Sequence, residues 1–311
     1  MLQTPILKSA WDAFRSGQLK AALQLSRQSI MQEQTNPSDS PMQYIRAQQA
    51  ILELGRSQTR PALNLLLANL QETPDSQLYQ GIYLAMLAES LKSQPHQSRV
   101  PQLIIGIGTG RCGSSSLSQL LKEQNANAFF SHEHPVRLAW GKSGQRLEWH
   151  LQRFKLLSKH FDFFGDVSHW WLPHCEQLLS LYPSCKIVAL QREKTETIES
   201  FVNIKKTKHG TINHWSSSDE NRIPNMWDEC YPTYAIPHIE KCLARYWEDY
   251  YTEVQDLKEK FASSVLIVRT EQLADPETQR QLLEFCGFNE IGINSDIHLN
   301  KLTAADSDGK W

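Results

Sequence analysis

The chain has 311 residues, of which 32 are Lys or Arg and 34 are Asp or Glu, so its formal charge is −2. This near balance gives no support to a nucleic-acid-binding surface, and we expect no nucleic-acid partner. The six cysteines show neither a CxxC pair nor a histidine-rich metal-binding spacing. We therefore expect buried thiols in a reducing compartment and no metal site. A chain of this length favours about two domains.

The N-terminal stretch MLQTPILKSAWDAFRSG lacks the apolar core of a signal peptide. No uncharged apolar run in the chain approaches the ~20 residues that span a bilayer. These two observations predict a cytoplasmic protein without a membrane span.

Residues 1–98 are predicted to be all-helical. Two patterns of small and large apolar residues resemble degenerate tetratricopeptide-type helical hairpins. The first consists of Ala10, Phe14, Gly17, Ala22 and Leu25, and the second of Ala47, Leu54, Gly55, Ala62, Leu66 and Pro74. Since such repeats usually need about three copies for stability, this segment is expected to pack on the following domain or on a protein partner. An unrelated helical extension is the alternative interpretation.

Residues 99–311 form the second predicted segment, in which strands and helices alternate. The expected strands are 103–107, 127–131, 162–165, 186–190 and 264–268. The expected helices are 114–124, 145–160, 173–181, 195–206, 237–261 and 276–286. This order predicts an α/β fold, a P-loop-like and mostly parallel sheet with helices on both faces. Ligands of such sheets bind beyond the carboxyl ends of the strands.

The stretch LIIGIGTGRCGSSSLSQLL, residues 103–121, reads as a strand, a tight loop and a helix N-terminus. Such a loop directs backbone N–H groups and the positive end of a helix dipole toward one point. Gly108, Gly110 and Gly113 permit close approach of a ligand to the backbone. Arg111 adds a forked donor that suits phosphate or sulfate. The loop therefore predicts a site for a phosphate-bearing nucleotide.

Two familiar phosphate loops fit this stretch only in part. Residues 108–113 satisfy GxGxxG, with Glu133 twenty residues beyond Gly113, which is the dinucleotide pattern. However, the turn carries a charged arginine and the helix opens with three serines. The stretch also fits GxxxxG-x-[ST], but Ser114 occupies the position of the P-loop lysine. Asp166 is only a weak candidate for a magnesium-binding aspartate, so an ATP- or GTP-hydrolysing enzyme is disfavoured.

A second stretch, KIVALQREKTETIESFVNIK at 186–205, places Arg192 at the end of a strand and Ser200 in an early turn of the next helix. A guanidinium group and a hydroxyl group at these positions can converge on one anion. Together with the glycine-rich loop they form two separate anion sites. Two such sites fit a nucleotide with phosphates at both its 5′ and 3′ positions.

The stretches TGRCGSSSL and LQREKTETIESFV resemble the two nucleotide-binding motifs of the sulfotransferase superfamily, which uses 3′-phosphoadenosine 5′-phosphosulfate (PAPS). The first motif is similar to the loop of the tyrosylprotein and carbohydrate branches, although Cys112 and Ser114 stand where the family more often has Ser and Thr. The resemblance covers residues 103 to about 311. It implies that the loop holds the 5′-phosphosulfate and that Arg192 and Ser200 hold the 3′-phosphate. The expected cofactor-binding residues are Gly110, Arg111, Cys112, Gly113, Ser114, Ser115, Ser116, Arg192 and Ser200.

The expected catalytic groups are Arg111, which would stabilise charge on the leaving oxygen, and a general base after the second strand. Glu133 is the preferred base, because the resembling branches place a glutamate comparably. His132 and His134 flank it and are alternatives. The expected reaction moves a sulfuryl group from PAPS to an acceptor hydroxyl of a sugar, lipid, peptide or small molecule. The alternatives are a Rossmann- or kinase-type nucleotide-dependent enzyme and a non-catalytic nucleotide-binding adaptor.

Four other sets of residues carry weaker expectations. Ser168 or Asp166 is expected to cap a helix, or to contact substrate as in the family's GxxS stretch. Residues 205–237 suit a lid through Lys205, Lys206, Lys208, His209, Trp215 and Trp227, or form a surface insertion. The tail HLNKLTAADSDGKW resembles the family's last nucleotide-contacting loop, with Asn300, Lys301 or Lys310 near the 3′-phosphate. Trp170 and Trp171 are expected in the core.

Overall fold

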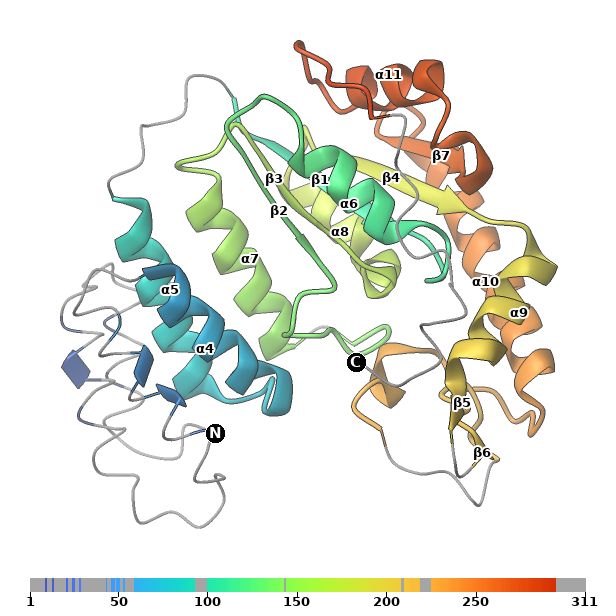
Figure 1. The fold of residues 1–311 in the computed structure, drawn as a ribbon, viewed down its shortest axis with the longest axis horizontal. Helices are drawn as coiled ribbons and strands as arrows, with labels where there is room; N and C mark the ends of the chain where they lie inside the picture. Colours follow the sequence, from blue (N-terminus) through green and yellow to red (C-terminus); the bar gives the residue numbers. More distant parts are fainter. Residues whose placement is uncertain are drawn as a thin grey trace. The chain divides into compact units, whose positions relative to one another are not determined.

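Five parallel strands form the central sheet of the computed structural model (Figure 1). Their order across the sheet is β2 (Ala128–His132), β3 (Phe163–Val167), β1 (Gln102–Ile107), β4 (Lys186–Gln191) and β7 (Val265–Arg269). The structure describes residues 59–92, 100–142, 144–207, 210–218 and 225–294, together with scattered positions between 9 and 53. The central position of β1 brings the loop that follows it between the ends of its two neighbours, β3 and β4.

Helices cover both faces of this sheet. On one face, α6 (Ser114–Lys122) and α11 (Pro276–Phe285) contribute Leu117, Leu120 and Leu282 to the core cluster. On the other face, Phe164 of β3 contacts Tyr182, directly after α8 (Cys175–Leu181). The three central strands, β3, β1 and β4, are almost continuously buried, as expected when both faces of a parallel sheet are covered. The predicted α/β fold with a mostly parallel sheet is confirmed.

Two further helices, α9 (Lys194–Lys205) and α10 (Ile239–Lys260), lie where the sequence predicted them. Three short 3-10 helices, η2 (His169–His174), η3 (Asp228–Cys230) and η4 (Thr270–Gln272), were not expected. A short antiparallel pair, β5 (Lys206–Thr207) and β6 (Gly210–Thr211), follows α9 and was not expected from the sequence. None of the described helices is long and apolar enough to cross a membrane.

The core contains the residues that the sequence assigned to it. Trp170 and Trp171 are both fully buried. All six cysteines are buried free thiols, and burial raises the pKa of the Cys112 thiol to about 11. The thiols therefore pack as small apolar side chains.

Helices α4 (Thr59–Glu72), α5 (Gln77–Leu91) and most of α7 (Gln145–Leu157) form a compact unit with residues 135–137, and the sheet belongs to the second unit. The indole of Trp149 in α7 donates a hydrogen bond to the carbonyl oxygen of Gln80 at 3.1 Å and contacts Tyr83. Arg146 forms a two-pronged ion pair with Asp75. Thus α7, which lies between β2 and β3 in the chain, packs with α4 and α5.

The tetratricopeptide-like interpretation of the N-terminal part stays a prediction. Most residues of its first pattern lie outside the described residues. Of the second pattern, Ala47, Ala62 and Leu66 are buried.

Gly165 is essential to the packing of β3 against β1. A Cβ atom at this position would collide with the backbone carbonyl group of Ile104 on the neighbouring strand. Because backbone atoms of a central strand cannot move aside easily, we expect Gly165→Ala to lower the free energy of unfolding by about 2–3 kcal/mol. Urea unfolding measures this change. Gly292→Ala is the matched control, since its Cβ would make only ordinary contacts with Gln124, and a change within about 0.5 kcal/mol is expected. Equal stability of the two variants would contradict the argument.

Candidate functional site

The loop between β1 and α6 has a backbone that only glycine adopts easily at three positions. The φ angles are 155° at Gly108, 86° at Gly110 and 86° at Gly113, and Gly113 is the N-cap of α6. A Cβ atom at Gly108 would also collide with the Cys112 sulfur and lie 2.7 Å from the carbonyl oxygen of Leu190. The glycines therefore permit a tight turn directly at the helix N-terminus, where an anion is favoured.

Hydroxyl groups from two other elements hold this loop in place. The Gly108 amide donates to the Tyr250 hydroxyl at 2.9 Å, and the Tyr246 hydroxyl donates to the Thr109 carbonyl oxygen at 3.1 Å. Both tyrosines belong to α10 and are buried. Thr270, after β7, donates to the Cys112 carbonyl oxygen at 2.7 Å. These bonds preorganise the loop before any ligand binds.

The two stretches that the sequence paired lie side by side. The Arg111 Nε donates to the Ser200 hydroxyl at 3.1 Å, and the Arg192 Nη1 donates to the Arg111 carbonyl oxygen at 3.1 Å. Glu196 accepts from the Arg192 Nε at 3.1 Å. Burial and the neighbouring Arg192 guanidinium group lower the pKa of Arg111. Two guanidinium groups this close create a local positive field that favours an anion.

The remaining loop residues differ in what their side chains can reach. The imidazole Nε2 of His132, at the end of β2, lies 3.0 Å from the Ser114 hydroxyl. Ser114 and Ser115 are partly exposed, whereas Ser116 is buried. The Cys112 thiol is buried in the core cluster. A contact of Cys112 with a nucleotide, which the sequence assigned to it, can therefore come only from its backbone.

Glu133 and Arg111 have unusual backbone conformations. Their φ angles are 46° and 57°, and among the residues that the structure describes they are the only non-glycine residues with positive φ. Left-handed conformations of such residues are uncommon, and they concentrate at functional sites where the surroundings hold them. Both residues were singled out from the sequence for catalysis.

The Glu133 carboxylate lies among charged groups. Its pKa is raised by burial and, to a smaller extent, by the Asp166 carboxylate, while His132, Lys205 and Arg111 act in the opposite direction. Within the described part of the chain its side chain makes no hydrogen bond. A carboxyl group with a raised pKa and no fixed partner is suited to accept a proton.

The sequence named Lys205 only as a part of a lid, not among the catalytic or cofactor-binding residues. It is the last residue of α9, the helix that carries Ser200. Burial lowers the pKa of Lys205 to about 8, although the nearby Glu133 carboxylate opposes this shift. Its position on the same predicted helix as Ser200 was the sequence signal that could have placed Lys205 near the site. Its burial could not be predicted, because it depends on tertiary packing.

Several weaker expectations are corrected. Asp166 is buried in β3, where its carboxylate accepts hydrogen bonds from Ser131, Ser168 and Trp171, so it is a structural anchor. The Ser168 side chain makes no capping hydrogen bond to η2. His134 is buried.

Trp215, one of the residues expected in a lid over 205–237, belongs to an aromatic core instead. Trp215 is fully buried, with Phe201, Tyr231 and Tyr246 around its ring. The Tyr231 ring also stacks on His169, with ring centroids 4.3 Å apart. The expectations for Lys208, His209, Asn300, Lys301 and Lys310 lie outside the described residues.

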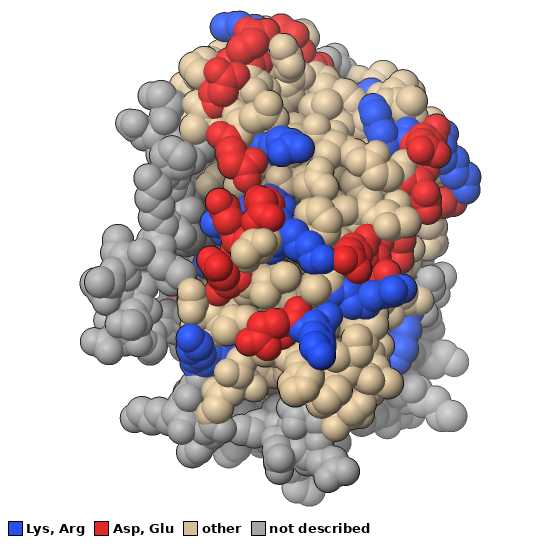
Figure 2. All heavy atoms as spheres, turned by 90° about the vertical axis from the view of Figure 1, so that its right-hand side faces the viewer, with Lys and Arg blue, Asp and Glu red and all other residues tan. Residues whose placement is uncertain are grey.

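Acidic and basic side chains are interspersed on the face that Figure 2 shows. Ion pairs on α9 and α10 join Lys194 to Glu248 at 2.6 Å and Arg245 to Asp249 at 2.9 Å. The charges on this face thus form neighbouring pairs of opposite sign.

Residues 103–274 match the family model of a sulfotransferase domain. The matched range contains the glycine-rich loop, Glu133, Arg192, Ser200 and Lys205. No curated protein matches the chain.

Proposed function

Because the chain belongs to the sulfotransferase family, we propose that it transfers the sulfuryl group of PAPS to an acceptor hydroxyl and releases 3′,5′-bisphosphoadenosine (PAP). The observation that carries this proposal is the contact between two distant motifs, in which Arg111, Arg192 and Ser200 lie together beside the glycine-rich loop. A nucleotide with phosphates on both its 5′ and 3′ positions matches this arrangement of donors.

In the proposed complex, the loop amides around Gly113 and the hydroxyls of Ser114 and Ser115 bind the 5′-phosphosulfate. Such a loop at a helix N-terminus is suited to an anion. Arg192 and Ser200 bind the 3′-phosphate, and the planar guanidinium group of Arg192 donates hydrogen bonds to the phosphate oxygens. Arg111 belongs to the loop and also contacts both residues assigned to the 3′-phosphate, because its carbonyl oxygen accepts from Arg192 and its Nε donates to Ser200.

The reaction forms a bond between the acceptor oxygen and sulfur and breaks the bond between sulfur and the 5′-phosphate oxygen. Glu133 takes the proton of the acceptor hydroxyl, and the electron pair of the broken bond stays on the phosphate of PAP. Arg111 stabilises that negative charge. Lys205, whose charge interacts with both Glu133 and Arg111, contributes to the same positive field.

The nucleotide assignment is tested by calorimetry with PAP and 5′-AMP, which differ only in the 3′-phosphate. We expect PAP to bind more tightly, and Arg192→Ala to weaken PAP binding about 10- to 100-fold through the loss of a charged hydrogen bond. The affinity for 5′-AMP should change little in this variant. Lys194→Ala is the matched control, because Lys194 pairs with Glu248. Equal affinities of the unaltered protein for PAP and 5′-AMP would exclude the assignment, and tight binding of NAD(H) or ATP instead would favour the alternative enzymes.

A pH profile tests the role of Lys205. Because the pKa of Lys205 is about 8, sulfuryl transfer should decline as the pH rises through this value and the ammonium group is lost. Lys205→Arg keeps its charge and should move this decline to higher pH, whereas Lys205→Met should lower kcat about tenfold at pH 7. Lys206→Met, at the exposed neighbouring position, should leave the profile unchanged. An unaltered alkaline limb in Lys205→Arg would refute the assignment.

Transfer itself is measured with sulfur-labelled PAPS and acceptors that carry sugar, lipid, peptidyl tyrosine or simple alcohol hydroxyls. We expect label to enter one of these classes. If PAPS binds with full affinity but no acceptor gains label, the result would favour a nucleotide-binding adaptor.

A further inference from the structure

His132 and Ser114 come from different elements and meet at the N-terminus of α6. Ser114 is the first residue of α6, directly after the N-cap Gly113, and His132 is the last residue of β2. Because β1, β2 and β3 run parallel, the carboxyl end of β2 lies at the edge of the sheet where α6 begins. The imidazole Nε2 of His132 lies 3.0 Å from the Ser114 hydroxyl oxygen there. The contact therefore lies at the loop assigned above to the 5′-phosphosulfate.

This contact is the one hydrogen bond that the described part of the chain offers to either side chain. Both side chains are partly exposed, so a ligand can reach them. Since no described residue bonds to the other ring nitrogen of His132, Nδ1, either nitrogen can carry the proton of a neutral imidazole. In the free protein, either group can therefore be the donor of this bond.

A bound nucleotide removes this choice. The oxygens of a 5′-phosphosulfate only accept hydrogen bonds, whereas a serine hydroxyl has one proton to donate and two lone pairs. When Ser114 donates its proton to the phosphosulfate, it can only accept from His132. The proton of the imidazole must then be on Nε2. A hydroxyl that accepts such a bond is also a stronger donor itself, because hydrogen bonds in a chain polarise one another.

We propose that His132 is a positioning residue, whose Nε2–H group donates to Ser114 and thereby directs the Ser114 proton to the 5′-phosphosulfate. This inference rests on the proposed function, in which Ser114 binds that end of the nucleotide. It also bears on the choice of the general base, because an Nε2 that donates to Ser114 cannot take the proton of the acceptor hydroxyl. That proton then goes to Glu133.

Calorimetry on the full chain tests this role with PAP and with adenosine 3′-phosphate, which lacks the 5′-phosphate. His132→Leu removes the donor, and we expect it to weaken PAP binding about 3- to 10-fold through the loss of one hydrogen bond. Its affinity for adenosine 3′-phosphate should not change, because that nucleotide has no group for Ser114 to bind. A general disturbance of the fold would weaken both nucleotides alike, so the difference between them is the readout.

Two further variants separate positioning from packing. His132→Gln keeps an N–H group at the end of its side chain and should recover most of the PAP affinity lost in His132→Leu. Ser114→Ala removes the intermediate hydroxyl and should weaken PAP binding about tenfold. In the double variant, His132→Leu should add no further loss to Ser114→Ala, because its effect passes through the Ser114 hydroxyl.

His238→Leu, at an exposed position directly before α10, is the matched control and should bind both nucleotides as the unaltered protein does. Thermal unfolding shows which variants keep the fold, and His132→Ala, which also lacks the donor, replaces His132→Leu if the latter does not fold. Independent losses in the double variant, or equal weakening of both nucleotides in His132→Leu, would overturn this inference alone. If the unaltered protein does not bind PAP, the proposed function fails and this inference fails with it.

Discussion

Replacing Arg111 by glycine is expected to lower kcat of sulfuryl transfer about 10²- to 10³-fold, because a charged donor to the leaving oxygen is removed. Glycine is the better substitution, since Arg111 has a φ of 57° that alanine would adopt only under strain. Arg111→Lys should recover activity only in part, because an ammonium group lacks the planar fork of donors. Steady-state kinetics with PAPS and the acceptor measure these changes.

Thermal unfolding separates the loss of chemistry from the loss of the fold in this experiment. Arg111→Gly should keep the melting temperature, since glycine is unstrained at positive φ. Arg280→Ala, at an exposed position of α11, is the control for removing an arginine from the surface. If Arg111→Gly retains kcat within tenfold of the unaltered protein, Arg111 does not stabilise the leaving group.

Replacing Glu133 by glutamine is expected to lower kcat about 10²- to 10⁴-fold, the usual effect of removing a general base. Glutamine preserves the shape of the side chain, so the affinity for PAP should change little. Burial raises the pKa of Glu133. As the pH is lowered, Glu133 should therefore take up a proton, and the unaltered protein should lose activity, at a higher pH than an ordinary carboxyl group would. The residual activity of Glu133→Gln should lack this acid limb.

Two further variants decide between the candidate bases. Glu199→Gln, exposed on α9, should behave as the unaltered protein. His132→Asn should lose less activity than Glu133→Gln, because the His132 ring already contacts the Ser114 hydroxyl. The reverse order, with His132→Asn nearly inactive and Glu133→Gln mildly affected, would assign the proton to His132.

The sheet could be predicted because buried parallel strands have nearly continuous apolar sequences, such as LIIGI at 103–107 and KIVAL at 186–190. Their alternation with helices then indicated the fold. The meeting of the loop with Arg192 and Ser200 also followed, since the ends of parallel strands share one edge. The functional roles of these residues stay predictions.

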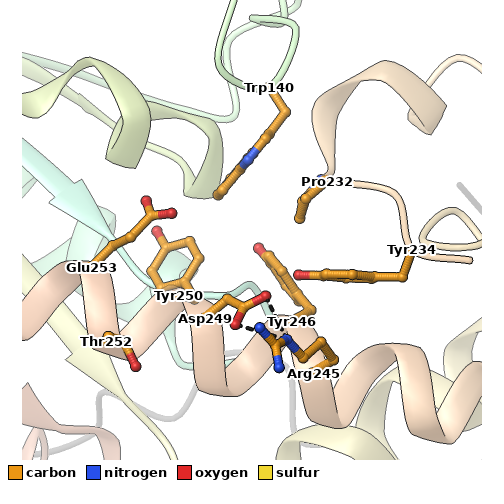
Figure 3. A pocket seen from close by; sticks show the side chains of 9 residues that line it. All are labelled: Trp140, Pro232, Tyr234, Arg245, Tyr246, Asp249, Tyr250, Thr252 and Glu253. Carbon is orange, nitrogen blue, oxygen red and sulfur yellow. Dashed lines mark hydrogen bonds and ion pairs between the residues drawn. The ribbon is translucent and has the colours of Figure 1, made fainter.

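Other features depend on packing that local sequence does not encode. The left-handed conformation of Glu133 accompanies a hydrogen bond from its amide to the carbonyl oxygen of Val167, on the neighbouring strand. The burial of Lys205 and Trp215 depends on how the irregular stretch 205–237 folds back, and no periodicity marks that path. A cavity beside α10 is lined by residues from three separate segments, around Trp140, around Tyr234 and in α10 itself (Figure 3), so sequence spacing gave no sign of it.

Helix α7 has a consequence for any attempt to separate the two parts of the protein. Trp149 of this helix is fully buried, its indole donates a hydrogen bond to Gln80 of α5, and its ring contacts Tyr83 of the same helix. A chain cut near residue 98 would keep α7 but lose α5, which would expose this large aromatic side chain to water and favour self-association. The N-terminal helices therefore cannot be removed without affecting the rest of the chain, because α7, which packs with them, lies in the sequence between two strands of the sheet.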